Sequence, residues 1–540
     1  MGDEMSLKPK PPRPMPDDVG RLGDKLIAPE SPYRLVGERL YIKYRDADYV
    51  DLYSPEGKPG LSPVDLSFVT AFQFLEGLSD RAVADAVRLR LDFKFALHLP
   101  LDHPGFHYSV LSEFRDRVIG HQAEERVFNS TLQDLDALGL LKRRGRQRTD
   151  SLAIVTRVRD LNRLELVVET VRLALRVLLV ADPDWTRATV PPEWEVVYGE
   201  RCMAVQMTEA QRRDLEARVG SDGQWLLTRV QAETTPGQLR ELPEVQVLAT
   251  VWAQQFEVVD EKLGFRTPGH YDGRAQIQSP HDPDARWSRK GEQEWVGDKL
   301  QVTETDDEDL PHLITDIAVT SSVETDYEAL PAIQERLEGR DLLPGRQITD
   351  GGYMGAENLV TSSERGIELF GPVQRDSSRQ ARQPGGLTSA CFRLNRETGT
   401  VTCPAGQTTR LWVKADQRVV GRFIKKVCVQ CEWYTHCCTG PRGRAVSFGP
   451  HHEILEAARA RQKTEAFKTE YRQHRGGVEG CLSSLVRGQR MRVARYTRRA
   501  KRHLHALFAG VGVNLRRAAR WLAGIRPQLR QVGLGLAPTD

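Results

Sequence analysis

Three acidic residues stand in surroundings that could support metal-dependent chemistry. Asp150 in "TDSLAIV" and Asp350 in "QITDGGYMGAENL" each border an apolar run that predicts a β-strand, and Glu479 lies in a predicted helix. Carboxylate oxygens are the protein ligands that Mg²⁺ takes. Two such ions, about 3.5 to 4 Å apart, can hold the attacking and leaving oxygens of a phosphodiester. The three acids are therefore candidates for a two-metal site.

Each acid also has a plain structural interpretation. An Asp followed by two glycines, as at Asp350, is more often part of a turn, because glycine adopts backbone angles that other residues resist. A Glu near a helix start, as at Glu479, usually interacts favourably with the helix dipole. The glycines after Asp350 would equally let the backbone approach a metal ion or a phosphate closely. Local sequence alone leaves both interpretations open.

Six of the eight cysteines fall between Cys391 and Cys438. A CxxC pair with further cysteines upstream and downstream can supply four thiolates to zinc. The candidate structural Zn²⁺ ligands are Cys403, Cys428, Cys431 and one of Cys437 and Cys438. The alternative is a group of free thiols in a small β-structured insertion.

The net charge of +3 hides a strong segregation of charge along the chain. Residues 291–338 are acidic, whereas residues 480–539 contain thirteen Arg or Lys and no Asp or Glu. Such a basic region repels itself unless it meets a polyanion, so nucleic acid is the expected partner. The alternative is a solvated basic helix face.

A chain of 540 residues is too long for one hydrophobic core and predicts two to four structural units. Residues 1–30 are polar and proline-rich, which predicts a disordered tail and no secretory signal. No apolar run approaches the roughly 18 to 20 residues that span a bilayer. We therefore expect a cytoplasmic protein that does not enter membranes. Residues 31–148 predict an all-helical unit that includes a helix-turn-helix-like pair.

Beyond this unit, apolar runs and helical patterns alternate, which predicts a mixed α/β sheet. The core would begin at residues 149–374, interrupted by a helical insertion at about 157–260. A cysteine-rich insertion would occupy residues 375–450, and residues 451–540 would complete the core with basic helices. The predicted strands lie at residues 149–155, 294–305, 313–322, 346–349 and 366–373.

Several long segments resemble a DDE transposase of a bacterial insertion sequence. They include "SPVDLSFVTAFQFLEGLSDRAVADAV", "TDS", "LLPGRQITDGGYMGAENL", "GIELFGPV" and "RGGVEGCLSSLVRGQRMRVARYTRRAK", and they follow the family's order over most of residues 60–525. The resemblance implies an RNase H-like catalytic core. It also implies that Asp150, Asp350 and Glu479 form the metal-binding triad, with two Mg²⁺ or Mn²⁺ ions.

Such transposases also carry Tyr, Arg, Glu and a basic residue at set intervals. Here Tyr471, Arg475 and Glu479 fall at four-residue steps along one helix face. The usual step from Tyr to Arg is one residue shorter, and Val486 stands where a Lys or Arg is usual, with Arg487 next. The other candidates for DNA contact are Arg490, Arg495, Lys299 and Trp295; packing within the sheet is an equal alternative for Trp295.

The implied activity is cleavage at transposon ends, followed by attack of the freed 3′-hydroxyl on target DNA. A homodimer would hold two terminal inverted repeats through the helical N-terminal unit and the basic C-terminal region. Two alternatives remain: an RNase H-like nuclease that cuts without joining, and a catalytically inactive, element-derived DNA-binding protein. The presence of all three acids argues against the second.

Overall fold

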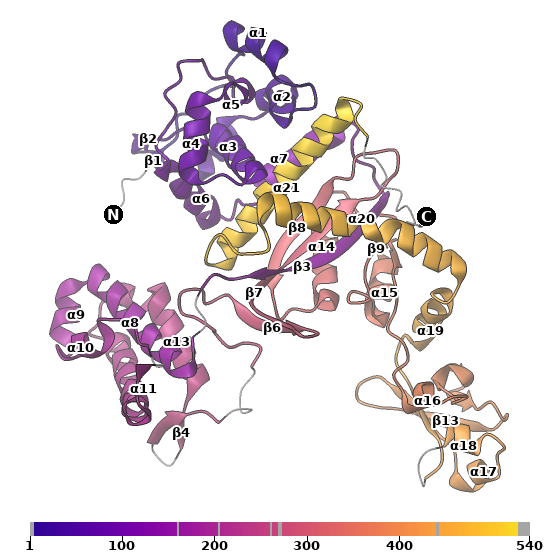
Figure 1. Ribbon diagram of the computed structural model, residues 1–540. Helices are drawn as coiled ribbons and strands as arrows, with labels where there is room; N and C mark the ends of the chain where they lie inside the picture. The colour runs from indigo at the N-terminus through magenta and orange to yellow at the C-terminus, as the bar shows by residue number, and fades with distance from the viewer. Residues whose placement is uncertain are drawn as a thin grey trace, which may run out of the picture.

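The computed structural model describes residues 5–158, 161–203, 206–259, 262–267, 273–438 and 442–526. The chain forms a helical N-terminal unit, a mixed α/β core and two insertions that project from the core (Figure 1). Within these ranges, no helix is both long and apolar enough to cross a membrane.

The N-terminal unit is built around the buried helix α3 (Pro63–Glu76). Its start is set by Ser62, whose side chain accepts a hydrogen bond from the backbone of Asp65, and its end by Gly77 at φ +67°. The helices around it are α1 (Asp17–Leu26), α2 (Pro32–Leu35), α4 (Asp80–Leu89), α5 (Leu91–Ala96), α6 (Ser109–Gly120) and α7 (Arg126–Ala137).

The prediction of a disordered tail up to residue 30 is wrong for the residues that the structure describes. Helix α1 buries Val19 and packs with Ile27 against Phe95. Arg13 forms an ion pair of 2.6 Å with Asp65. A few well-placed apolar residues and one ion pair therefore anchor a segment whose composition suggested disorder.

The core is a six-stranded mixed sheet, so the mixed α/β prediction is confirmed. Its strand order is β10-β9-β3-β7-β6, with β8 also paired to β7. The pairs β3–β9 and β9–β10 are parallel, and the other pairs are antiparallel. The strands are β3 (Arg146–Val155), β6 (Arg286–Lys290), β7 (Gln293–Thr305), β8 (Ile314–Ser321), β9 (Arg346–Ile348) and β10 (Glu368–Phe370).

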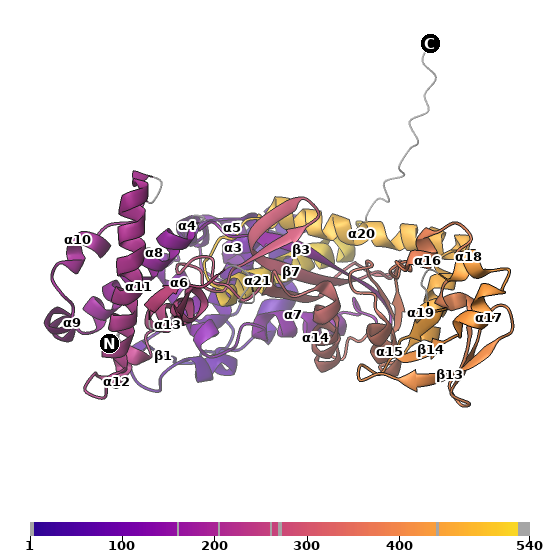
Figure 2. The same cartoon turned by 90° about the horizontal axis from the view of Figure 1, so that it is seen from below.

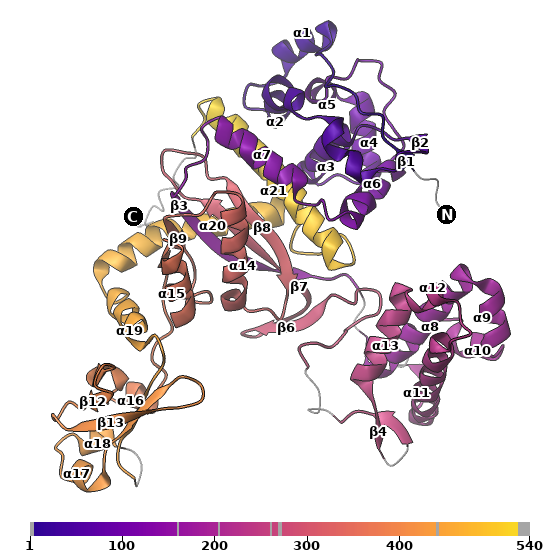
Figure 3. The ribbon, with the colours of Figure 1, turned by 180° about the vertical axis from the view of Figure 1, so that it is seen from behind.

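Helices cover both faces of this sheet. The long helix α20 (Glu465–Gln489) lies on one face, and α14 (Asp326–Gly339) and α15 (Ala356–Glu364) lie on the other (Figures 1 and 3). Helix α21 (Arg499–Leu522) runs from the sheet to α3 and joins the core to the N-terminal unit.

Two insertions lie at opposite ends of the molecule (Figure 2). The first has its own apolar core, formed by α8 (Arg163–Ala181), α11 (Glu209–Gln231) and α13 (Pro243–Gln255). It also contains the short helices α9 (Pro183–Thr189), α10 (Trp194–Tyr198) and α12 (Gly237–Arg240). A hairpin of β4 (Phe256–Val259) and β5 (Lys262–Phe265) completes it. The second contains most of the cysteines. It has strands β11 (Arg393–Asn395), β12 (Thr400–Thr402), β13 (Thr408–Val413), β14 (Val419–Arg422) and β15 (Ala445–Phe448) and helices α16 (Arg379–Arg382), α17 (Lys425–Val429) and α18 (Tyr434–Cys437). Helix α19 (His452–Arg461) then leads back to α20.

The basic C-terminal region meets acids of the chain itself. Arg502 is 2% exposed and pairs with both Asp282 and Asp298, and Arg517 pairs with Glu304 at 2.6 Å. Part of this region therefore pairs with acids of the chain itself, because α21 packs on the sheet that carries much of the acidic segment and the opposite charges are buried together. Further pairs are Arg495–Asp80, Arg498–Glu244, Arg499–Asp298 and Lys501–Asp116.

Candidate active site

Asp150 lies in the middle of β3 and is largely buried. Its Oδ2 accepts a hydrogen bond of 2.7 Å from Nη2 of Arg475 on α20, and its Oδ1 accepts one of 2.8 Å from the Ser151 N–H. Burial raises the pKa of Asp150 above its usual value; Arg475 and the Ser151 N–H lower it in part, and nearby Asp350 raises it further. Asp150 is therefore a carboxylate with few water contacts and one cationic partner.

Asp350 follows the short strand β9, which runs parallel to β3. The strands pair with a constant offset, so that Arg146 lies beside Arg346 and Arg148 beside Ile348. Continued by two residues, the same register places Asp350 next to Asp150. The Gly352 N–H donates a hydrogen bond of 2.8 Å to Asp350 Oδ1 and holds this carboxylate at the strand end.

A third carboxylate near this position was not singled out from the sequence. A Cβ at Gly352 would lie 3.0 Å from Asp350 Oδ1 and 3.1 Å from Asp326 Oδ2, so these two side chains flank the glycine. Asp326 opens α14 behind the N-cap Thr325. In the sequence it looks like any acid in a first helical turn, which interacts with the helix dipole. Only the three-dimensional structure, in which the start of α14 lies against Gly352, shows that Asp326 is close to Asp350.

Tyr353 lies fully buried beneath these carboxylates. Its hydroxyl donates a hydrogen bond of 2.5 Å to Gln301 Oε1 on β7. Burial raises the pKa of Tyr353 well above its usual value, and Asp326, Asp150 and Asp350 act in the same direction. The phenol therefore stays protonated and supports the site as a hydrogen-bond donor.

Glu479 lies on α20, one turn beyond Arg475, and its side chain is exposed. It forms no hydrogen bond or ion pair with a described residue. Within the described ranges, no group of three or more His, Cys, Asp or Glu side chains is arranged to hold a metal ion. The structure thus brings Asp150 and Asp350 together and places Glu479 on the helix that contacts them, outside their immediate group.

Helix α20 is positioned by a buried arginine on the same strand as Asp150. Arg148 is 4% exposed; its Nε donates a hydrogen bond of 2.8 Å to Glu304, and its Nη1 donates one of 3.3 Å to the His474 carbonyl of α20. Arg148 also pairs with Asp306. A Cβ at Gly477 would lie 1.9 Å from Nη1 of Arg148, so only glycine lets the helix rest directly on this guanidinium.

Tyr471 and the C-terminal arginines occupy distinct environments. The Tyr471 hydroxyl donates a hydrogen bond of 3.2 Å to the Thr349 carbonyl, directly before Asp350. Arg487 and Arg490 are exposed and form no ion pair with the described part of the chain. Arg495, by contrast, lies over the rings of Phe74 and Tyr496 and pairs with Asp80, at the contact with the N-terminal unit.

The two predicted DNA contacts on β7 differ in their surroundings. Lys299 Nζ donates a hydrogen bond of 2.6 Å to the Glu324 carbonyl and lies 3.5 Å from Asp326. Trp295 is 7% exposed, so its indole is not available at the surface, and packing within the sheet is the correct alternative.

The cysteines Cys403, Cys428, Cys431, Cys437 and Cys438 surround one cavity of about 690 Å³ in the second insertion. Burial raises the pKa of the Cys438 thiol, and the neighbouring Cys428 thiol raises it further. Within the described ranges, these side chains do not form a group of three or more that could hold a metal ion. The prediction of a zinc site is therefore not supported, and the arrangement is that of free thiols around a cavity.

Comparison with protein families assigns two parts of the chain. Residues 402–519 match a transposase DDE domain, and residues 22–117 match a transposase domain (DUF772). These two matches support a DDE transposase of an insertion sequence. The first match contains Tyr471, Arg475 and Glu479, whereas Asp150 and Asp350 lie outside both matches. No curated protein and no solved structure matched the chain.

Proposed function

We propose that the chain cleaves transposon ends and joins the freed 3′-hydroxyl to target DNA in a core of the RNase H-like type. The observation that supports this proposal is that Asp150 on β3 interacts electrostatically with Asp350, just after the parallel strand β9, and accepts a hydrogen bond from Arg475 on the helix that also carries Glu479. One carboxylate on a strand and a second just beyond the end of the neighbouring strand suit a site that must hold charge near a phosphodiester.

The donor set fits Mg²⁺ or Mn²⁺, because these ions take carboxylate oxygens. Asp150, Asp350 and Glu479 would hold two ions, and Asp326 is close enough to Asp350 to support them. When bound, the ions would supply the positive charge that activates the attacking oxygen and stabilises the leaving one. Glu479 lies four residues beyond Arg475, or about 6 Å along the helix axis, so a local change at α20 would add it to the pair.

Arg475 has a second capacity beyond its contact with Asp150. Its Nη2 binds the carboxylate, while its Nη1 is buried and has no hydrogen-bond partner among the residues that the structure describes. A buried donor without a partner costs free energy that an anionic oxygen would recover. We therefore assign Nη1 of Arg475 to a phosphate oxygen of the bound DNA, next to the reacting carboxylates.

DNA would approach this face of the core along α20. Arg487 and Arg490, near the end of that helix, remain free of ion pairs within the described ranges and would contact phosphates. A synaptic homodimer would hold two terminal inverted repeats, because joining both ends to one target requires two sites.

A strand-transfer assay tests the proposal and separates it from a nuclease of the same fold. Oligonucleotide ends that already carry a free 3′-hydroxyl are incubated with a plasmid target and Mg²⁺. Joined product is expected from the wild type and not from Asp150→Asn or Asp350→Asn, whereas Asp416→Asn, an exposed acid in the second insertion, serves as the control. Cleavage of full-length ends with no joined product would show a nuclease instead.

A further inference from the structure

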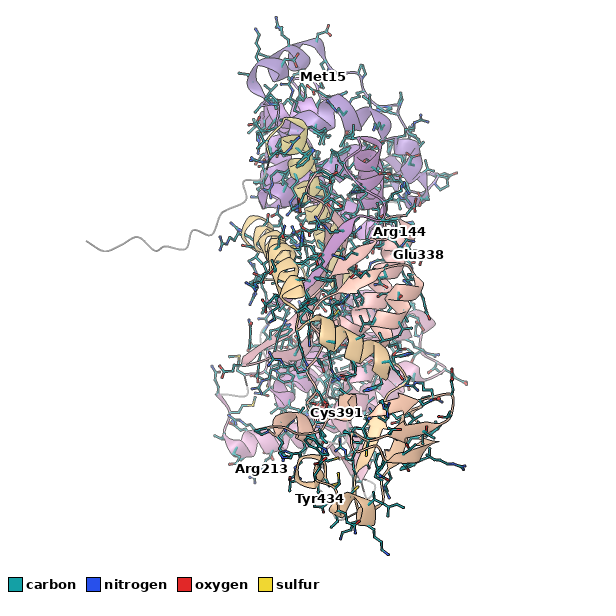
Figure 4. The ribbon with its side chains drawn as sticks, turned by 90° about the vertical axis from the view of Figure 1, so that its right-hand side faces the viewer. Met15, Arg144, Arg213, Glu338, Cys391 and Tyr434 are labelled. Atoms are coloured by element: carbon teal, nitrogen blue, oxygen red, sulfur yellow. The ribbon has the colours of Figure 1, made fainter. Side chains whose placement is uncertain are left out.

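The second insertion presents an open sheet face that the candidate active site does not use. Its strands follow the order β11-β12-β13-β14-β15, and every neighbouring pair is antiparallel. One face buries Val401, Val446 and Phe448 against Phe392 and Phe423. Figure 4 shows Cys391 and Tyr434 of this insertion far from Met15, toward the opposite end of the molecule.

The other face is basic and carries one exposed indole. Arg393, Arg410 and Arg422 are exposed on it, and none of them forms an ion pair with a described residue. Trp412 is 42% exposed, and the Arg422 guanidinium lies 5.7 Å from its ring centroid. The five strands contain no Asp or Glu. We define this surface, made of Arg393, Arg410, Trp412 and Arg422, as the arginine–tryptophan face.

Two like charges on this face lie opposite each other and destabilise the folded insertion. Leu411 pairs with Gly421, so the same register places Arg410 opposite Arg422. Like charges directly opposite each other on a sheet are destabilising. Residues 375–450 carry thirteen Lys or Arg against four Asp or Glu, and within the described residues none of the four acids forms an ion pair with Arg410 or Arg422. A bound polyanion would compensate for the repulsion between these two arginines.

We propose that the arginine–tryptophan face binds a single-stranded or unpaired segment of DNA, with the arginines on phosphates and Trp412 stacked on a base. Exposed aromatic rings interleaved with arginines on a sheet are the arrangement that binds unpaired nucleic acid, because every base offers a flat face for stacking. The inference rests on the proposed function in that DNA is the substrate, but it needs no catalysis.

The test is fluorescence anisotropy of a labelled single strand, bound to the full chain in the presence of a metal chelator. Trp412→Ala is compared with Trp433→Ala, because Trp433 is equally exposed but lines the cysteine cavity. We expect Trp412→Ala to bind roughly 5- to 150-fold more weakly, as loss of one base stack requires. Trp412→Phe should retain most of the affinity, and Trp433→Ala should match the wild type.

A salt series tests the arginines. The double variant Arg410→Ala/Arg422→Ala should lower the slope of log affinity against log salt by about 1.4, since each phosphate contact to a single strand contributes about 0.7. The control is Arg418→Ala, whose guanidinium is already paired with Asp416.

Three results would overturn the inference: equal affinities for Trp412→Ala and Trp433→Ala, an unchanged salt slope, or displacement of the strand by poly-glutamate as effectively as by unlabelled oligonucleotide. The last result would indicate an acidic protein as the partner. Because binding is measured without metal, these failures differ from failure of the proposed function, which would leave binding intact and abolish metal-dependent joining.

Discussion

Replacing Gly477 by Ala tests whether Arg148 positions helix α20. The added Cβ would lie 1.9 Å from Nη1 and 2.1 Å from Cζ of Arg148, whereas real Cβ contacts are essentially never closer than 3.0 Å. Either the guanidinium leaves its place or the helix moves by about 1 Å. Displacing the guanidinium costs free energy, because buried Glu304 would keep only Arg517 and buried Asp306 only His474 as partners.

The size of the effect depends on whether Arg148 or helix α20 is displaced. Breaking a buried ion pair by removing one partner costs about 3 to 5 kcal/mol, while Gly to Ala in a helix contributes about 1 kcal/mol in the opposite direction. The expected net loss of stability is about 2 to 4 kcal/mol if Arg148 is displaced. If α20 moves instead, the contact between Arg475 and Asp150 is disturbed, and a misplacement of about 1 Å can cost about 100-fold in rate.

The assay is urea unfolding followed by circular dichroism, together with the rate of end cleavage. Gly476→Ala and Gly480→Ala are the matched controls, since a Cβ at either position has no neighbour within 4 Å. Both should stabilise the helix by up to about 1 kcal/mol. A double-mutant cycle with Arg148→Ala should be strongly non-additive, because both changes affect one contact. A Gly477→Ala variant as stable and as active as Gly476→Ala would refute the reasoning.

The remaining predictions concern three buried contacts. Hydrogen bonds from Arg172 and His281 more than offset burial and lower the pKa of Glu169 to about 2. Glu169→Gln should therefore lower the free energy of unfolding of the first insertion by about 2 to 3 kcal/mol above a pH of about 4.3. In urea titrations, the difference in free energy of unfolding between variant and wild type should disappear as the pH falls through 2. A difference that stays constant with pH would contradict this. Tyr353→Phe leaves Gln301 without its donor and should cost about 1 to 3 kcal/mol, seen as a lower urea midpoint; an unchanged midpoint would show that the bond is not needed. Arg502→Met leaves buried Asp282 without its ion pair and leaves Asp298 with Arg499 alone, and it should cost about 3 to 5 kcal/mol by the same measurement; a loss below about 1 kcal/mol would place these charges in contact with water.

Local signals predicted part of the fold well. The Ser-Pro start and glycine end of α3 follow from capping chemistry. The strands β7 and β8 follow from apolar runs of strand length. Asp150 and Asp350 were singled out because each borders such a run and because the family resemblance implies them as a pair; β3 and β9 run parallel, with partners up to Arg148 and Ile348. These features depend on residues close together in the sequence.

Features that depend on distant pairing could not be predicted in the same way. The C-terminal arginines looked like a surface for nucleic acid, but Arg502 meets Asp298 some 200 residues earlier in the chain. The sequence shows that both charged residues are present, but it does not show that they are in contact. Asp326 resembled an ordinary acid at a helix start. For Trp295, the sequence supported exposure at the surface and packing within the sheet equally. Long-range packing decided each case.

The central claim is that Asp150, Asp350 and Glu479 together hold catalytic metal ions. It is tested most directly by titrating the full chain, bound to a transposon-end oligonucleotide, with Mn²⁺ and counting bound ions by electron paramagnetic resonance. We expect two ions per wild-type protomer. Asp150→Asn, Asp350→Asn and Glu479→Gln should each lose at least one, and Asp416→Asn none. Wild-type binding of Mn²⁺ by Asp150→Asn or Glu479→Gln would contradict the account.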